Sequence, residues 1–243
     1  MAEVSAASLR RHNPSLPITV FTDQEISCHR FDKIIELEKP DSVLALRLQK
    51  IRIFEKIRAK RGLYLDCDTF VAGNIMPLFA LMNRYDIAVA YDLGRHVSEP
   101  LGTHMNSGVI VFNNNERTRE LWRTWQHRFE KRPRLLSVVR DQPAFEYAVK
   151  ASKVRMFVLA PEFNMRLAPL GGQIAGEVKI FHGPHHMIRN GSIASLARFI
   201  NSESGIRIFD WRSGQMQMQD ITGVVGNNHS AEYRTRSYCL DHR

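Results

Sequence analysis

The chain has 243 residues, of which 44% are hydrophobic and 24% charged, and its formal net charge at pH 7 is +9. This length and composition fit one large α/β domain with a sizeable core. The positive charge points to an anionic partner such as nucleotide phosphates, nucleic acid or an acidic membrane surface. Much of the excess charge, however, comes from scattered arginines that are typical of a solvated helix face: Arg117, Arg119, Arg123, Arg128, Arg132 and Arg134.

The cysteines and the apolar runs give an indication of where in the cell the protein is located. Cys28, Cys67 and Cys239 are far apart and match no metal-binding spacing, and an odd count without a disulfide framework indicates a reducing compartment. No stretch approaches the roughly 18–20 apolar residues of a spanning helix. Residues 1–20 also lack the charged-then-apolar order of a signal peptide. We therefore expect a cytoplasmic protein that is able to contact a membrane surface.

Apolar runs and their boundaries predict secondary structure in chain order. The expected elements are a helix over 2–11, strands over 16–21 and 31–37, a helix over 42–60, strands over 63–65, 87–91 and 109–112, helices over 116–131 and 141–151, and strands over 156–159 and 178–181. Because strands alternate with helices almost throughout, we expect a three-layer α/β/α sandwich with a mostly parallel central sheet. Ligands on such sheets gather beyond the C-terminal ends of the strands.

Both ends of the chain depart from a regular α/β pattern. The chain opens with the helix that would normally follow a first strand, so either that strand is missing or the recorded start lies downstream of the real one. Residues from about 203 are rich in Ser, Gly, Gln and Asn and lose periodicity. We expect one domain over 1–200 and an irregular C-terminal tail over 201–243.

Asp66-Cys67-Asp68 follows the apolar strand 63–65 directly. Two carboxylates two residues apart at a strand end can reach one hard cation, and such a cation neutralises a diphosphate leaving group. An exposed acidic turn would also explain the pattern. A third interpretation is a haloacid-dehalogenase-type phosphatase, in which Asp66 would be the nucleophile. We disfavour it because 65 residues precede the motif and no later pair of aspartates supplies metal ligands.

Three further polar clusters lie where apolar runs start or stop. Asn106-Ser107-Gly108 enters a strand, and there Asn106 could bond a sugar hydroxyl or phosphate while Gly108 permits close backbone approach; an ordinary turn is the alternative. Asp141-Gln142-Pro143 begins a helix, and N-capping by Asp141 would be a complete structural explanation. His182-Gly183 ends a strand, where the imidazole of His182 could complete a metal shell or be a satisfied structural residue.

Lys50 lies in the apolar sector of the predicted helix 42–60. At 100° per residue this sector contains Val43, Leu46, Ile53, Phe54 and Ile57. A charged side chain there must either extend to solvent or meet a counter-charge. A diphosphate held just beyond the following strand is a suitable counter-charge.

The residues and motifs singled out so far, with Asp92, occur in a fixed order along the chain: Lys50, Asp66-x-Asp68, Asp92, Asn106-Ser107-Gly108, Asp141-Gln142 and His182-Gly183. Together they resemble family 8 glycosyltransferases, the glycogenin and lipooligosaccharide galactosyltransferase type, over about residues 16–186. A related group, the nucleotide-diphospho-sugar transferases with a terminal His-Gly, is the closer alternative. The resemblance implies a GT-A fold over 1–200, a nucleotide-sugar donor with a UDP-sugar favoured, Mn²⁺ or Mg²⁺, and transfer of a hexose to an acceptor hydroxyl with retention.

The resemblance also implies roles for individual residues. Asp66, Asp68 and His182 would be the metal ligands. The catalytic residues would be Gln142, which would lie beneath the anomeric carbon, and Asp141, which would contact the donor sugar. The donor-binding residues would be Lys50, Asp92, Asn106, Ser107, Gly108 and Gly183. The family's terminal lysine is missing or replaced by Arg189.

The sequence does not identify the acceptor of the sugar. The acceptor could be a saccharide, a lipid-linked sugar or a protein, and nucleic acid is not the expected partner because no basic surface pattern interleaved with aromatics is visible. The alternative function is a non-catalytic nucleotide-sugar or nucleic-acid binder of the same fold.

Overall fold

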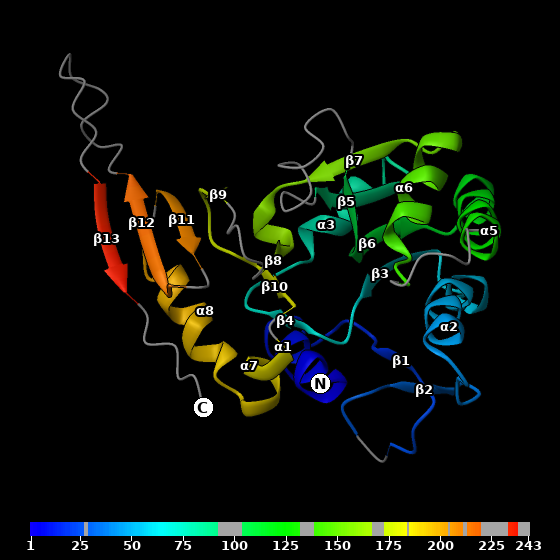
Figure 1. The fold of residues 1–243 in the computed structure, drawn as a ribbon, viewed down its shortest axis with the longest axis horizontal. Helices are drawn as coiled ribbons and strands as arrows, with labels where there is room; N and C mark the ends of the chain where they lie inside the picture. Colours follow the sequence, from blue (N-terminus) through cyan, green and yellow to red (C-terminus); the bar gives the residue numbers. More distant parts are fainter. Residues whose placement is uncertain are drawn as a thin grey trace.

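The computed structural model describes residues 1–26, 29–91, 104–131, 139–166, 173–183, 185–203, 205–210, 213–219 and 233–237. Asp92, predicted to bind the donor, and the cysteines Cys28 and Cys239 lie outside these ranges. The described chain consists of four small sheets with helices packed around them (Figure 1). No described helix combines the length and the apolar character that crossing a membrane requires.

The helices of the described chain confirm the predicted ones and add several short ones. Those in the first half are α1 (Ala2–His12), α2 (Val43–Lys56), α3 (Pro77–Leu81) and α5 (Glu116–Glu130). Those in the second half are α6 (Gln142–Ala151), the 3₁₀ turn η1 (Pro161–Phe163), α7 (His185–Asn190) and α8 (Ile193–Asn201). Side-chain caps begin two of them: the Ser42 hydroxyl accepts from the Ala45 N–H, and Asn115 and Thr118 form a reciprocal capping box.

The main sheet has the strand order β3-β6-β5-β7, with β3 at Arg61–Leu65, β5 at Ile87–Tyr91, β6 at Met105–Asn113 and β7 at Met156–Leu159. β6 pairs antiparallel with both β3 and β5, and only β5 and β7 are parallel. The expectation of a mostly parallel sheet was therefore wrong. Parallel neighbours need a long crossover, usually a helix, and the sequence predicts no helix between the strands that became β5 and β6.

The strands β1 (Thr19–Thr22) and β2 (Lys33–Glu36) form a separate parallel pair. Among the described residues they share no ladder with the main sheet, and the chain opens with α1, as the sequence predicted.

Aromatic side chains fill the core between the main sheet and the helices α2, α5 and α6. Phe54 of α2 stacks on Trp122 of α5 with ring centroids 4.2 Å apart, and Trp125 packs 4.7 Å from Phe145 of α6. Val43 and Leu46, predicted on the same apolar face as Phe54, are instead 59% and 49% exposed. The buried residues that α2 contributes to this core, Ile51, Ile53 and Phe54, therefore all come from its C-terminal half.

A second sheet, β4-β10-β8, joins distant parts of the chain. Its strands are β4 (Thr69–Val71), β8 (Met165–Arg166) and β10 (Ile180–His182). α1 packs on this sheet, where the Ser8 hydroxyl accepts from the Val71 N–H at 2.9 Å and Ser5 bonds Thr69 at 2.9 Å. The N-terminal helix thereby holds the chain that follows Asp68.

The expectation of irregular chain beyond residue 200 was wrong for three segments, which form the strands β11 (Ile206–Asp210), β12 (Gln215–Gln219) and β13 (Tyr233–Ser237). They form a sheet with β9 (Gln173–Ile174) in the order β13-β12-β11-β9. Met216 is buried and Gln217 exposed, as expected for a strand that covers a core on one face. Because this segment is rich in glutamine, its alternation of buried and exposed residues was not recognised in the sequence. The division of the chain into domains at residue 200 stays a prediction.

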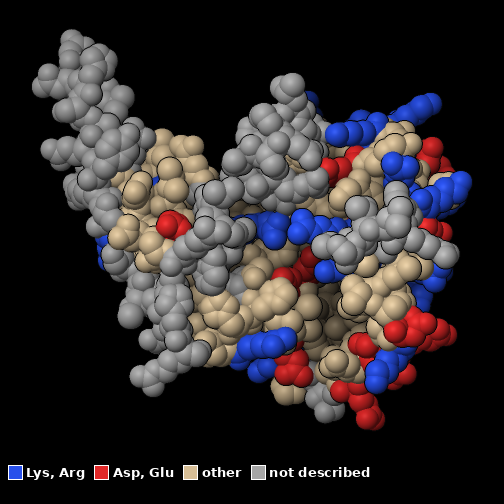
Figure 2. All heavy atoms as spheres, in the orientation of Figure 1, with Lys and Arg blue, Asp and Glu red and all other residues tan. Residues whose placement is uncertain are grey.

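Charged side chains of both signs crowd the face of the molecule over α2 and α5 (Figure 2). Arg119 and Arg123 of α5 both pair with Glu116, and Arg117 pairs with the buried Asp86. The interpretation of the described arginines of α5 as a solvated helix face is therefore confirmed, because all of them are exposed.

Candidate metal centre and donor site

The turn Asp66-Cys67-Asp68 connects β3 to β4 and is held at both ends by backbone hydrogen bonds. The Asp66 N–H donates to the Gly108 carbonyl at 2.8 Å, which extends the β3–β6 ladder by one residue. The Gly183 N–H donates to the Asp68 carbonyl at 2.9 Å. Both carboxylates therefore project from a turn whose backbone is anchored on two different strands.

His182 reaches this turn because of strand register. It is the last residue of β10, which pairs antiparallel with β4 so that His182 lies opposite Thr69, the residue after Asp68. Gly183 continues the chain with a φ of 95°, a left-handed conformation that favours glycine. The role of Gly183 in this structure is thus conformational, and its predicted contact with a donor stays a prediction.

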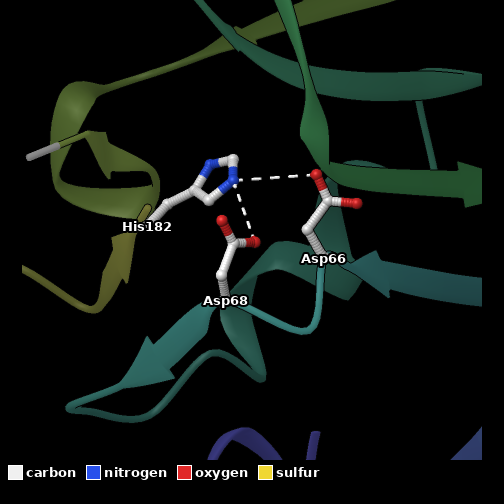
Figure 3. Close-up of side chains that lie close together, drawn as sticks. All are labelled: Asp66, Asp68 and His182. Atoms are coloured by element: carbon white, nitrogen blue, oxygen red, sulfur yellow. Dashed lines mark ion pairs between the residues drawn. The ribbon is translucent and has the colours of Figure 1, made fainter. Parts of the chain in front are cut away.

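The three side chains converge on one point (Figure 3). His182 Nε2 lies 3.6 Å from Asp66 Oδ2 and 3.5 Å from Asp68 Oδ1. One ligand atom from each residue falls within 4.8 Å of the others. Two carboxylates and an imidazole fit a divalent cation that takes oxygen and nitrogen ligands. The sequence prediction that these residues come together is confirmed, and they could hold a metal ion.

The carboxylates are held by further donors. The Tyr64 hydroxyl donates to Asp66 Oδ1 at 2.5 Å, and His185 Nε2 lies 2.8 Å from Asp68 Oδ2. Burial raises the pKa of Asp68, but hydrogen bonding and charge from His182 and His185 outweigh it and hold that pKa well below its ordinary value. Asp68 is therefore ionised at neutral pH, as a metal ligand must be.

Gly108 of β6 lies directly against the candidate metal ligands His182 and Asp66. A Cβ at this position would stand 2.1 Å from His182 Cε1 and 2.9 Å from Asp66 Oδ2. The sequence predicted close approach to this glycine, and in the structure the approaching groups are protein side chains. A side chain at position 108 would occupy the space of the imidazole.

Replacing Gly108 with alanine should therefore displace His182 and raise the Kd for Mn²⁺ by about 10–100-fold, the range typical when the surroundings of a ligand are disturbed. Electron paramagnetic resonance of free Mn²⁺ measures this. Gly176→Ala is the matched control, because a Cβ there would meet only Glu162 at an ordinary 3.7 Å. Equal Mn²⁺ affinity in both variants would contradict the steric argument.

Lys50 lies at the centre of a second cluster, beside the candidate metal ligands. Its Nζ is 3.1 Å from Asp66 Oδ1, 3.2 Å from Asp141 Oδ2 and 3.2 Å from Ser107 Oγ. Burial lowers the pKa of Lys50, but the charges of Asp66 and Asp141 outweigh it and raise that pKa above its ordinary value. The counter-charge that the sequence analysis sought in a diphosphate is supplied here by two protein carboxylates.

Asp141 does not cap helix α6 with its side chain, although it occupies the N-cap position. Its carboxylate instead bonds Ser107 Oγ at 3.1 Å, and its backbone carbonyl accepts from Trp125 Nε1 at 3.2 Å. Burial raises the pKa of Asp141, but Lys50 above all, with Arg47, outweighs it and lowers that pKa. The purely structural explanation offered by the sequence is therefore wrong, and Asp141 belongs to the Lys50 cluster.

Asn106 connects the two clusters to Gln142. Its Nδ2 donates to Gln142 Oε1 at 3.3 Å, and its Oδ1 accepts from the Gly108 N–H at 2.9 Å. These contacts bring the candidate metal ligands together with five other predicted site residues: Asn106, Ser107, Gly108, Asp141 and Gln142. Their assignment to the donor stays a prediction.

Sequence reasoning missed four residues of this site. Tyr64 shares a strand face with Asp66, two residues on, and Arg47 precedes Lys50 by one helical turn, so both had a periodicity signal. Arg47 reaches within 3.9 Å of Asp141. His185, whose side chain is 60% exposed, had no pattern that distinguishes it from an ordinary surface histidine. Asn164, whose Oδ1 lies 2.9 Å from His182 Nδ1, had no signal because its position follows from long-range pairing.

The fold and the site together define an α/β protein with a candidate cation centre at its strand ends and a buried lysine beside it. A sequence model of the nucleotide-diphospho-sugar transferase family matches residues 39–167, more than half of the chain. The chain belongs to this family, as the sequence resemblance suggested. The haloacid-dehalogenase interpretation is thereby set aside. No curated protein sequence matches the chain.

Solved structures of glycosyltransferases share the fold. The galactosyltransferase LgtC superposes with a TM-score of 0.53 at 15% identity, covering 75% of this chain and 83% of its own. Mouse xyloside xylosyltransferase 1 gives 0.52 at 15% identity, covering 76% and 91%. GlyE of Streptococcus pneumoniae TIGR4 gives 0.52 at 22% identity, covering 68% of this chain but only 43% of GlyE, so the chain spans less than half of that enzyme. The predicted GT-A-type fold and the predicted enzyme class, a glycosyltransferase, agree with the family and with all three neighbours.

Proposed function

We propose that this protein transfers a hexose from a nucleotide-diphosphate sugar, with a UDP-sugar as the expected donor, to an acceptor hydroxyl. The observation that carries the proposal is the convergence of Asp66, Asp68 and His182 within 4.8 Å, beside the buried ammonium of Lys50. A donor diphosphate is anionic, and this site combines a candidate cation centre with a fixed positive charge. The galactosyltransferase LgtC, solved in complex with donor and acceptor sugar analogs, supports the proposal through its similar fold.

The ion we propose is Mn²⁺ or Mg²⁺, held by Asp66, Asp68 and His182. When bound, it would neutralise the diphosphate and make it a better leaving group. The carboxylate oxygens suit either ion, and the imidazole favours Mn²⁺.

The chain's own residues would provide binding and electrostatic stabilisation. Lys50 would contact the donor phosphates through Nζ, a preorganised positive charge that needs no reorganisation as negative charge develops on the leaving group. Gln142, held by Asn106, would lie beneath the anomeric carbon, and its amide oxygen would face the developing positive charge. An active-site glutamine in LgtC supports this assignment.

In this reaction the acceptor oxygen bonds to the anomeric carbon as the bond from that carbon to the diphosphate oxygen breaks. The acceptor attacks the face that the diphosphate leaves, which retains the anomeric configuration. The hydroxyl proton passes to the departing phosphate oxygen, so no protein base is required.

A panel of UDP-, GDP- and ADP-sugars tests the proposal through metal-dependent hydrolysis. We expect at least one UDP-sugar to be hydrolysed with Mn²⁺ and none with excess EDTA, and we expect calorimetry to show that UDP binds only when Mn²⁺ is present. Proton NMR of the first sugar product tests retention. If no sugar nucleotide is bound or hydrolysed, and the protein instead binds RNA tightly in a salt-sensitive manner, the non-catalytic alternative is correct.

A further inference from the structure

The two ring nitrogens of His182 face different partners. Nε2 faces the carboxylates of Asp66 and Asp68, whereas Nδ1 lies 2.9 Å from Oδ1 of Asn164. An imidazole can bind a cation through Nε2 only if that nitrogen carries no proton, so its last proton must remain on Nδ1. The identity of the nitrogen that keeps the proton therefore decides whether the site can bind metal.

The hydrogen bonds around Asn164 determine this choice. The backbone N–H of Gly108 can only donate, and it donates to Asn106 Oδ1 at 2.9 Å. The same Oδ1 accepts from Asn164 Nδ2 at 2.9 Å, which orients the Asn164 amide so that its oxygen faces His182. An amide oxygen can only accept. Nδ1 of His182 must consequently be the donor, and Nε2 is the nitrogen left for the cation.

We infer that Asn164 is a positioning residue that, oriented by Asn106, keeps a proton on Nδ1 of His182 and so presents Nε2 to the metal ion. The inference rests on the proposed function, because it assigns a task at the metal site of that function. It adds a residue outside the ligand set, and it gives Asn106 a task distinct from its predicted contact with the donor.

The burial of these side chains strongly favours this one arrangement of donors and acceptors. Asn106, Asn164 and His182 are respectively 3%, 4% and 5% exposed. Water therefore has little access to replace a lost partner, and a reversed amide would place oxygen against oxygen at Asn106. Outer-shell partners of metal-ligating histidines typically contribute 10–100-fold to metal affinity.

Two substitutions at position 164 separate hydrogen bonding from packing. Asn164→Leu fills a similar volume but has no acceptor, and we expect its Kd for Mn²⁺ to rise by about 10–100-fold. Asn164→Asp loses the donor to Asn106, but either carboxylate oxygen can accept from Nδ1–H. We expect its Kd for Mn²⁺ to stay within about threefold of the wild type, since the outer-shell partner is preserved. Electron paramagnetic resonance of free Mn²⁺ gives the affinities.

Asn113→Leu is the matched control. Asn113 lies at the opposite end of β6 from Asn106 and donates to the Met82 and Tyr85 carbonyls at 2.6 and 2.8 Å. Its replacement removes two partly buried hydrogen bonds of an asparagine amide, so thermal stability should fall while Mn²⁺ affinity is unchanged. Melting curves on all variants establish that each one folds.

A second measurement needs neither metal nor activity. In ¹⁵N-labelled, metal-free protein, the Nδ1 proton of His182 should exchange slowly enough to give a one-bond proton–nitrogen correlation. His182→Asn identifies the signal by its disappearance. We expect the correlation in wild type and Asn164→Asp and its loss in Asn164→Leu.

The outcomes separate this inference from the proposed function. If Asn164→Leu binds Mn²⁺ as tightly as wild type, or if the leucine and aspartate variants lose affinity equally, the inference is wrong although the metal site stands. If wild-type protein shows the Nδ1 correlation but no saturable Mn²⁺ binding, the proposed metal-dependent function is wrong although the hydrogen-bond order stands.

Discussion

Asp68→Ala should abolish measurable Mn²⁺ binding and, with it, metal-dependent binding of any sugar nucleotide. Asp68 Oδ1 faces the point shared with His182 and Asp66, so its loss leaves two of the three candidate ligands found among the described residues. We expect the Kd for Mn²⁺ to rise more than about 100-fold, beyond the range typical of losing an outer-shell partner. Paramagnetic resonance of free Mn²⁺ and calorimetry with UDP measure the two effects.

The control for Asp68→Ala lies one residue away. Cys67 sits between the two aspartates, is exposed and contributes no ligand to the cluster, so Cys67→Ala should bind Mn²⁺ like the wild type. The turn itself should survive in both variants, because its backbone hydrogen bonds involve the carbonyls of Asp66 and Asp68 and not their carboxylates. Unaltered turnover of a sugar nucleotide by Asp68→Ala would contradict the proposed metal site.

Lys50→Met should destabilise the metal-free protein by about 3 kcal/mol, because removing one partner of a buried ion pair leaves the other charge unpaired. The Lys50 side chain is only 11% exposed, and that of Asp141 only 8%. Chemical denaturation measures the free energy of unfolding. The same variant should also bind UDP more weakly in the presence of Mn²⁺, since its donor-phosphate contact is lost.

The loss of stability in Lys50→Met should depend on pH, because it comes from the buried carboxylates that Lys50 pairs with. In the wild type, Lys50 helps to hold the pKa of Asp141 below its ordinary value, so the stabilisation is present above the unfolded-state pKa of the carboxyl and is lost as the pH falls. In Lys50→Met, burial raises that pKa unopposed by Lys50. The stability difference between variant and wild type should therefore be largest near neutral pH and should narrow in acid, where the carboxylates are protonated.

Two variants make the Lys50 prediction specific. Lys50→Arg keeps the charge and should recover most of the stability. Lys56→Met removes the same charge from an exposed position at the last turn of α2, and it should cost little. If Lys50→Met and Lys56→Met have equal free energies of unfolding, the ion-pair cluster contributes nothing to stability.

The sequence predicted most elements of this fold because their signals are local. The apolar runs before Asp66 and His182, the cap at Ser42 and the periodicity of α5 each depend on residues within a few turns or one strand. Strand direction was predicted wrongly, because periodicity marks a strand without specifying which neighbour it pairs with. The strands after residue 205 were missed for a different reason, since a composition rich in polar residues hid the alternation of Met216 with its neighbours.

The candidate site also has some features that the sequence predicted and others that only the tertiary structure placed. By itself, the sequence determined that two aspartates leave one strand together and that Lys50 lies on the apolar side of its helix, since both follow from the spacing of near neighbours. Only the tertiary structure decided that β10 pairs with β4 so that His182 meets both aspartates. It also decided that Asp141 turns from its helix toward Lys50 and that Asn164 orients the imidazole. The physical reason is that these contacts join segments far apart in the chain, and strand register and burial, which no local pattern encodes, bring them together.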